Sequence, residues 1–183
     1  MTNPTAADHP GGRSSFLDVP RDALVLLVGI AASGKSTFAG RHFAPTEVLS
    51  SDALRAMIAD DAHAQSATDD AFDLLHRLLA MRLRRGRLTV VDATNVEGWA
   101  REQLLAVARR HRSPAVAIVL DLPFEVISAR NAARPAPRPP NAALRRQARW
   151  LAESVGAMAD EGFAAVHRLI TPETIDGVVV RRL

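Results

Sequence analysis

The sequence contains no cysteine, no tyrosine and a single lysine among its 183 residues. Without cysteine the chain can form no disulfide, no thiolate nucleophile and no Cys-based zinc site, which agrees with a cytoplasmic location. Aromatic residues make up 4% of the chain and apolar residues 48%, a balance that favours an α/β or α protein over a β-sandwich. No apolar run approaches the roughly 20 residues of a membrane span, so we expect no membrane association.

Positive charge is carried by 22 arginines and one lysine, Lys35. A genome-wide preference for arginine codons explains most of the arginine, but it does not explain the position of the one exception. Lysine is a compact point charge on a flexible stem, whereas arginine is a rigid planar fork. A site that requires lysine therefore cannot accept arginine. The net charge of +3 gives little support for extended contacts with nucleic acid.

Short apolar runs alternate with helical patterns along most of the chain. We expect residues 1–20 to be a flexible N-terminal tail and residues 21–183 to fold as one domain. Strands are predicted over 23–28, 47–49, 88–92, 115–122, 163–170 and 177–183. Helices are predicted over 35–43, after Asp52, over 69–85 and 98–111, from Pro123, and over 142–160. This alternation predicts an α/β fold with a parallel sheet sandwiched by helices.

The segment GIAASGKS, residues 29–36, matches the pattern G-x-x-x-x-G-K-[ST] and follows a buried strand directly. Such a loop wraps a phosphate with backbone N–H groups, while the lysine reaches the β- and γ-phosphates and the hydroxyl suits Mg²⁺. The pattern therefore predicts a P-loop NTPase-type domain that binds ATP and Mg²⁺, with Ser36 as the metal ligand. The predicted nucleotide-binding residues are Gly29, Ala31, Ala32, Ser33, Gly34, Lys35, Ser36 and Thr37.

Two aspartates follow the next two predicted strands, Asp52 after VLS and Asp92 at the end of LTVVD. Because ligands of open parallel sheets bind at the carboxyl ends of the strands, both should face the bound triphosphate. Asp52 is a candidate N-cap of a helix and a candidate base that accepts the proton of a substrate hydroxyl, and we expect one side chain to fill both roles. The missing Glu or Gln three residues later, where Arg55 stands instead, favours the base. Asp92 is the alternative base, or a carboxylate on the Mg²⁺ side.

Arginines cluster around the Pro-rich segment RPAPRPPN, residues 134–141. Arg130 and Arg134 lie four residues apart, so on one helix they would share a face and repel each other unless an anion lay between them. A mobile helical lid over the γ-phosphate, at about residues 130–150, is the expected location of such a pair. The other interpretation is a solvated pair in an arginine-rich chain.

Taken together, several segments resemble the polynucleotide 5′-kinase domain of the bacterial end-healing kinase–phosphatase, within the P-loop phosphotransferase superfamily. The resemblance runs from about residue 23 to 182. The phosphate loop alone indicates the superfamily, and SSDxxR together with VVDATN is more specific. The segments that carry the resemblance are GIAASGKSTFAGRHF, VLSSDALR, DDAHAQSATDDAFDLLH, RLTVVDATNV, ARNAAR and DEGF.

The resemblance implies a role for each matching residue. Lys35 and Ser36 would hold the ATP phosphates and Mg²⁺, and Asp52 would be the general base on a polynucleotide 5′-hydroxyl. Arg55 would bind the phosphate 3′ to the nucleoside that is phosphorylated. Three further positions follow from the same likeness: Arg130 over the donor phosphates, Arg134 near it in the lid, and Gln65 close to the acceptor pocket.

The large members of that family carry phosphatase and adenylyltransferase modules after the kinase, so we expect such partners to be separate proteins. The lid is also richer in proline than the family pattern. The leading hypothesis is an ATP-dependent kinase of RNA or DNA 5′-hydroxyl ends. Two alternatives stay open: a kinase of a nucleoside, sugar or antibiotic hydroxyl, and a nucleotide-binding switch with no acceptor.

Overall fold

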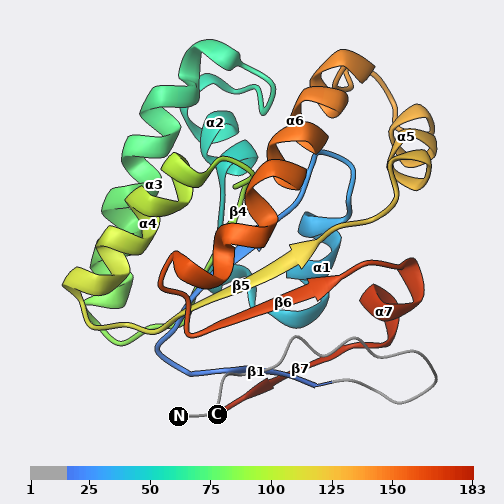
Figure 1. Cartoon of the computed structure of the whole chain (residues 1–183). Coiled ribbons are helices and arrows are strands. Elements are labelled where there is room, and N and C mark those ends of the chain that lie inside the picture. The colour runs from blue at the N-terminus through green and yellow to red at the C-terminus, as the bar shows by residue number, and fades with distance from the viewer. Residues whose placement is uncertain (1–15) are drawn as a thin grey trace.

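A computed structural model of the chain describes residues 16–183. Its centre is a five-stranded, all-parallel sheet with the strand order β3-β4-β2-β5-β6 (Figure 1). Since β2 lies between strands from later parts of the chain, the loop after β2 opens into the crevice where the strand order reverses. The strands are β2 (Leu24–Val28), β3 (Val48–Ser50), β4 (Thr89–Asp92), β5 (Ala115–Leu120) and β6 (Ala165–Leu169).

Helices connect these strands and cover both faces of the sheet, as the alternating pattern predicts. The α/β fold class is thereby confirmed. The helices are α1 (Lys35–His42), α2 (Ser51–Ala59), α3 (Thr68–Leu83), α4 (Gly98–Arg110), α5 (Phe124–Ala132), α6 (Asn141–Ser154) and α7 (Pro172–Gly177), with 3₁₀ turns at Pro45–Glu47, Gln65–Ala67 and Val155–Asp160. Among residues 16–183, no helix has both the length and the apolar content needed to cross a bilayer.

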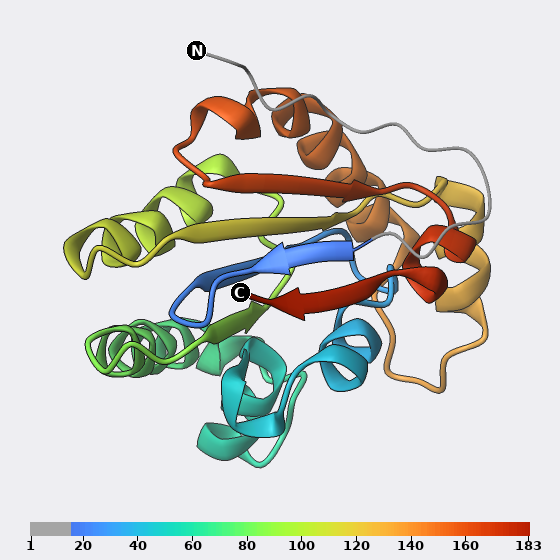
Figure 2. The same cartoon turned by 90° about the horizontal axis from the view of Figure 1, so that it is seen from below.

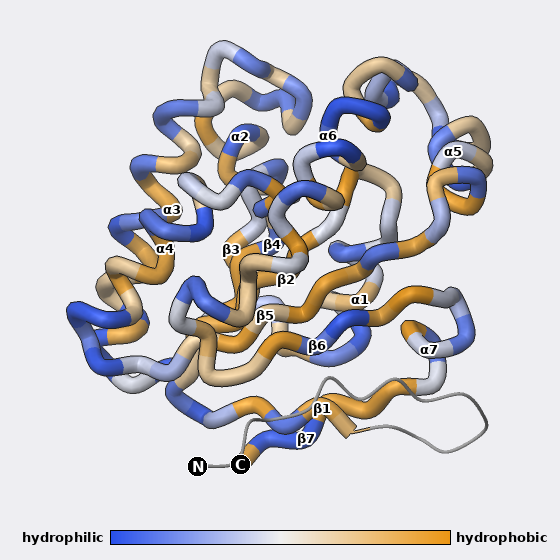
Figure 3. Tube along the Cα trace, viewed as in Figure 1, coloured by the Kyte–Doolittle hydropathy of each residue, from blue (hydrophilic) through white to orange (hydrophobic). Residues whose placement is uncertain are grey.

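The core lies along the central strand β2 and its neighbour β5. Every residue of β2 and of β5 is buried, which explains why both read as continuous apolar runs rather than as alternating patterns. Leu26 of β2 pairs with Val91 of β4 on one side and with Ala117 of β5 on the other. These strands form the orange centre of Figure 3, beneath helices whose outer faces are blue.

Part of the predicted N-terminal tail is a strand. β1 (Phe16–Val19) pairs in parallel with β7 (Val179–Arg182) as a separate two-stranded sheet, which Figure 2 shows from below. Leu17 and Val19 are buried, and Asp18 accepts hydrogen bonds of 2.6 and 2.8 Å from Arg181. The prediction of a tail over 1–20 is therefore wrong for this strand, and residues 1–15 lie outside the described residues.

Two helix ends differ from the prediction. Helix α6 stops at Ser154 and continues as the 3₁₀ turn Val155–Asp160, so the predicted helix over 142–160 has two parts. Helix α5 ends at Ala132, and Arg134 lies beyond it. Arg130 and Arg134 therefore do not share a helix face, because the chain turns toward the proline segment before the next turn can form.

Arg101 is completely buried, on the side of α4 that also carries Leu104, Leu105 and Ala108. Its guanidinium forms a bidentate ion pair with Glu161, in which Nε donates to Oε2 of Glu161 at 2.7 Å. Nη1 donates to the carbonyl oxygen of Asn95 at 2.9 Å. A planar fork with several fixed donors suits this position, and it ties α4 to the segment after α6.

Removing the counter-charge of Arg101 should destabilise the fold strongly. We expect Glu161→Ala to lower the free energy of unfolding by about 3–5 kcal/mol, because a buried guanidinium is left unpaired. The matched control is Glu102→Ala, which breaks an exposed pair with Arg109 on the same helix and should cost less than about 1 kcal/mol. Urea denaturation measures both. Equal losses for the two variants would contradict the assignment.

Candidate active site

The loop between β2 and α1 is the predicted phosphate loop, and its glycines are required by the backbone. Gly29 has φ +156°, and a Cβ there would lie 2.8 Å from the carbonyl oxygen of Leu120 and 2.8 Å from Oγ of Ser33. Gly34 has φ +103°, in the left-handed region that other residues rarely adopt. The loop can therefore approach β5 and then turn into α1 only with glycine at these positions.

Several N–H groups of this loop lack an acceptor within residues 16–183. They include those of Ala32, Gly34, Lys35 and Ser36, and α1 begins without a side-chain cap. Unpaired N–H groups at a helix N-terminus carry partial positive charge and bind anions. The loop therefore fits a phosphate group, as the sequence pattern predicts.

Lys35, the single lysine, is buried under the loop. Its Nζ donates to the carbonyl oxygen of Ile30 at 2.9 Å. Burial lowers the pKa of Lys35 to about 8, a shift that the charges of Asp92 and Asp52 oppose and that of Arg134 assists. Within residues 16–183 no carboxylate forms an ion pair with this ammonium group, and a bound phosphate would supply a counter-ion.

Asp92 ends β4 beside the start of α1, and it is buried. Burial raises the pKa of Asp92 above its ordinary value, while the nearby Ser36 hydroxyl and the charge of Lys35 oppose the rise. Within residues 16–183 no three His, Asp or Glu side chains cluster as a complete metal site. Ser36 and Asp92 fit a Mg²⁺ that takes its other ligands from phosphate and water.

The VVDATN loop is fastened to the strand that carries the phosphate loop. Asn95 donates from Nδ2 to the carbonyl oxygen of Leu27 at 2.8 Å, and the N–H of Gly29 donates to the carbonyl oxygen of Thr94 at 2.9 Å. Asn95 also has a positive φ of 49°. These bonds hold the ends of β2 and β4 together, so that Asp92 faces the phosphate loop.

Asp52 lies in the first turn of α2, and Ser50 is the N-cap instead. The Ser50 hydroxyl accepts from the N–H of Ala53 at 3.4 Å. The expectation that Asp52 caps its helix is therefore wrong, because the helix begins at Ser51, two residues earlier than predicted. The Asp52 side chain is 64% exposed and free of any capping role.

Arg55 is held beside Asp52. Its Nε donates to the carbonyl oxygen of Ala62 at 2.9 Å, and its Nη2 pairs with Oδ1 of Asp52. The Arg55 side chain is only 13% exposed, so its position is well defined. Gln65 lies three residues after Ala62 and is exposed. It donates to the carbonyl oxygen of His63 at 3.3 Å. The structure thus joins Asp52 to Arg55 and leaves the Gln65 side chain on the surface.

The segment predicted to form a lid, residues 130–150, begins in α5 and reaches the phosphate loop. Arg130 donates from Nη1 to the carbonyl oxygen of Ser33 at 3.2 Å. Arg134, in the loop after α5, is exposed but close enough to Lys35 to lower the pKa of Lys35. Both arginines therefore lie on the phosphate side of the lid, although they belong to different elements.

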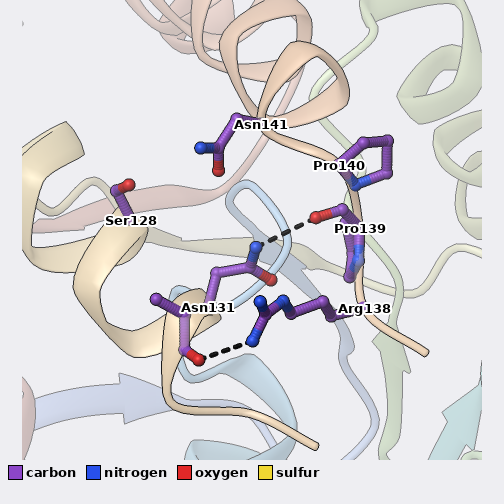
Figure 4. A pocket seen from close by; sticks show the side chains of 7 residues that line it. Ser128, Asn131, Arg138, Pro139, Pro140 and Asn141 are labelled. Carbon is purple, nitrogen blue, oxygen red and sulfur yellow. Dashed lines mark hydrogen bonds between the residues drawn. The ribbon is translucent and has the colours of Figure 1, made fainter. Parts of the chain in front are cut away.

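A cavity of about 260 Å³ lies inside the lid, between α5, the proline segment and the start of α6 (Figure 4). Asn131 is buried and donates from Nδ2 to the carbonyl oxygen of Pro139 at 2.9 Å. Arg138 folds back and donates to the carbonyl oxygen of Ala132 at 2.6 Å. These bonds fix the return of the proline segment toward α6.

Gln147 of α6 contacts the phosphate loop and was not predicted from the sequence. Its Oε1 accepts from the N–H of Ala31 at 2.8 Å. Gln147 lies between Leu144 and Leu151 on the buried side of the helix, a polar residue in an apolar series. That spacing was the signal that could have identified it.

Nucleotide affinity should depend on pH through Lys35. The pKa of about 8 means that the ammonium form is lost above that pH, while a bound phosphate favours it. We therefore expect nucleotide affinity to fall about tenfold between about pH 7 and pH 9. Calorimetric titration with ADP measures this, and Lys35→Met should bind weakly with little change over the same range. A wild-type affinity that does not change would contradict the prediction.

Comparison with solved structures gives kinases of low sequence identity. A putative kinase from Chloroflexus aurantiacus J-10-fl is 16% identical with a TM-score of 0.57, over 83% of this chain and 86% of that one. A chain of the Pnkp1/Rnl/Hen1 RNA repair complex is 22% identical with a TM-score of 0.66, over 76% of this chain and 47% of that one. The Mycobacterium tuberculosis APS kinase CysC, in complex with AMPPNP and APS, is 19% identical with a TM-score of 0.53, over 86% and 93%.

These likenesses show the fold, a P-loop kinase-like domain, and do not select a substrate. A comparison with curated protein sequences gives no match. The sequence profile of the AAA domain family matches residues 24–154, from β2 to the end of α6. This segment contains the phosphate loop, both aspartates and the lid, and the chain belongs to the AAA domain family.

Proposed function

We propose that the protein is an ATP-dependent kinase of polynucleotide 5′-hydroxyl ends. The observation that carries this proposal is the arrangement of Asp52 and Arg55, an exposed carboxylate with an anchored cation beside it. Phosphoryl transfer to a hydroxyl needs a carboxylate that accepts the proton. An acceptor with its own phosphate next to that hydroxyl also needs a cation at that point.

The donor side of the proposed site is built for a triphosphate. Free N–H groups of the phosphate loop, Lys35 and Arg130 present positive charge on the inner side of the lid. Positioning and electrostatic stabilisation supply most of the catalysis in phosphoryl transfer. Arg130 is placed to stabilise charge on the transferred group.

Asp52 would accept the proton as the acceptor oxygen bonds to the γ-phosphorus and the bond to the β–γ bridging oxygen breaks. Lys35 would hold the donor phosphates, and Arg55 would orient the acceptor through its adjacent phosphate. Ser36 and Asp92 are the residues that would hold Mg²⁺, which supplies charge neutralisation at the phosphates when bound. The pairing of Arg55 with Asp52 keeps both groups at one place before the acceptor enters.

A kinase of a small-molecule hydroxyl is the second candidate. The chain is also similar to a gluconokinase from Sinorhizobium meliloti 1021, with a TM-score of 0.53 at 16% identity. This likeness and the one to APS kinase support a small-molecule acceptor as much as the Pnkp1 likeness supports a polynucleotide. Arg55 favours an acceptor that carries a phosphate beside its hydroxyl, as a polynucleotide does, over a neutral sugar or alcohol.

The role of Asp52 is tested by Asp52→Asn. We expect transfer to fall about 10²–10⁴-fold, because the amide cannot accept the proton, while ATP affinity changes little. The matched control is Asp60→Asn at the exposed C-cap of the same helix, where φ is 54° and Asn is tolerated. Turnover is followed as ADP release with and without acceptor. If ATP turnover is unaltered in Asp52→Asn, the protein is a nucleotide switch or ATPase instead.

The role of Arg55 is tested by the choice of acceptor. We expect Arg55→Ala to reduce kcat/KM for a 5′-hydroxyl oligonucleotide by about 10–100-fold, the contribution of a hydrogen bond to a charged group. Activity on a neutral small alcohol should fall much less. Arg84→Ala, an exposed change just after α3, is the control. Equal losses on both acceptors would count against the polynucleotide assignment.

A further inference from the structure

Helix α6 presents one polar residue on its buried side. Residues at spacing i, i+3, i+4 and i+7 share a face of a helix, and here they are Leu144, Gln147, Ala148 and Leu151. Both leucines are buried in the core. Gln147 breaks an otherwise apolar series at the point where the helix passes over the phosphate loop.

The hydrogen bond of Gln147 determines how its carboxamide is oriented. Oε1 must face the N–H of Ala31, since that group is a donor and the distance is 2.8 Å. Nε2 therefore lies on the other arm of the amide. It carries two N–H donors, and no acceptor for them is found within residues 16–183. A free donor pair is thus held next to the phosphate loop.

The rest of α6 is anchored so that this position is maintained. The Ser154 hydroxyl at its end donates to the carbonyl oxygen of Val96 at 2.9 Å. Arg101 also donates to Ser154, at 3.4 Å. At the other side of the lid, Arg130 binds the carbonyl oxygen of Ser33. Helices α5 and α6 therefore bind the phosphate loop from two sides. Helix α5 binds the carbonyl group of Ser33, and α6 binds the N–H group of Ala31.

We propose that Gln147 is a γ-phosphate-recognition residue, which keeps Ala31 in place through Oε1 and donates from Nε2 to the terminal phosphate. ATP would gain this hydrogen bond and ADP would not, so Gln147 allows the lid helix to distinguish the two nucleotides. The inference rests on the donor half of the proposed function, the binding of ATP at the phosphate loop, and not on the identity of the acceptor.

Two substitutions separate this role from a structural one. Gln147→Glu keeps an oxygen that can accept from Ala31 but removes the donor and adds a negative charge. Gln147→Leu removes both hydrogen bonds at similar size. Arg149→Ala on the exposed side of α6, where Arg149 pairs with Glu153, is the control. The probes are ADP and the β,γ-imido analogue of ATP, each with Mg²⁺, titrated calorimetrically against the full chain after thermal melting has confirmed folding.

We expect Gln147→Glu to weaken binding of the imido analogue by about tenfold or more, and that of ADP by less than about twofold. Gln147→Leu should also weaken binding of the imido analogue more than binding of ADP. Arg149→Ala should leave both affinities unchanged. Equal weakening of both nucleotides would make Gln147 a structural residue and overturn the proposal. Tighter binding of the analogue, or no change, would overturn it as well. Failure of the wild-type protein to bind either nucleotide would instead refute the proposed function.

Discussion

The backbone N–H groups at the start of α1 need an acceptor that residues 16–183 do not supply. The same place holds the buried ammonium of Lys35 and, on the lid side, Arg130 and Arg134. Asp92 and Asp52 offset only part of this charge. An anion in the loop satisfies the N–H groups and the cations together, and the surrounding elements are arranged to receive it.

The neighbouring loops and the lid all attach to this point. The VVDATN loop binds Gly29 and Leu27, while α5 and α6 bind Ser33 and Ala31 through Arg130 and Gln147. The buried Arg101–Glu161 pair links the VVDATN loop to the segment that follows α6. The phosphate loop, the VVDATN loop, α5 and α6 are thus connected by hydrogen bonds between segments that lie far apart in the sequence.

Local patterns predicted the central strands, the phosphate loop and the strand-end aspartates, because each is a continuous run in which burial or backbone conformation decides the residue type. Long-range partners were not predictable. β1 is a short run whose partner lies at the other end of the chain. Two serines precede Asp52, and only the entry angle of the chain selects Ser50 as the cap. Arg101 and Gln147 lie on otherwise apolar helix faces but were not predicted from the sequence, and their partners Glu161 and Ala31 required the tertiary structure.

The central claim is that the crevice accepts a nucleic acid 5′-hydroxyl next to Asp52 and Arg55. The most direct test supplies γ-labelled ATP and Mg²⁺ with 5′-hydroxyl RNA and DNA oligonucleotides, beside a panel of nucleosides, sugars and other small alcohols. The account predicts label at the 5′ end of an oligonucleotide, with kcat/KM well above that for any small alcohol. Label on a small molecule and none on any oligonucleotide would contradict it.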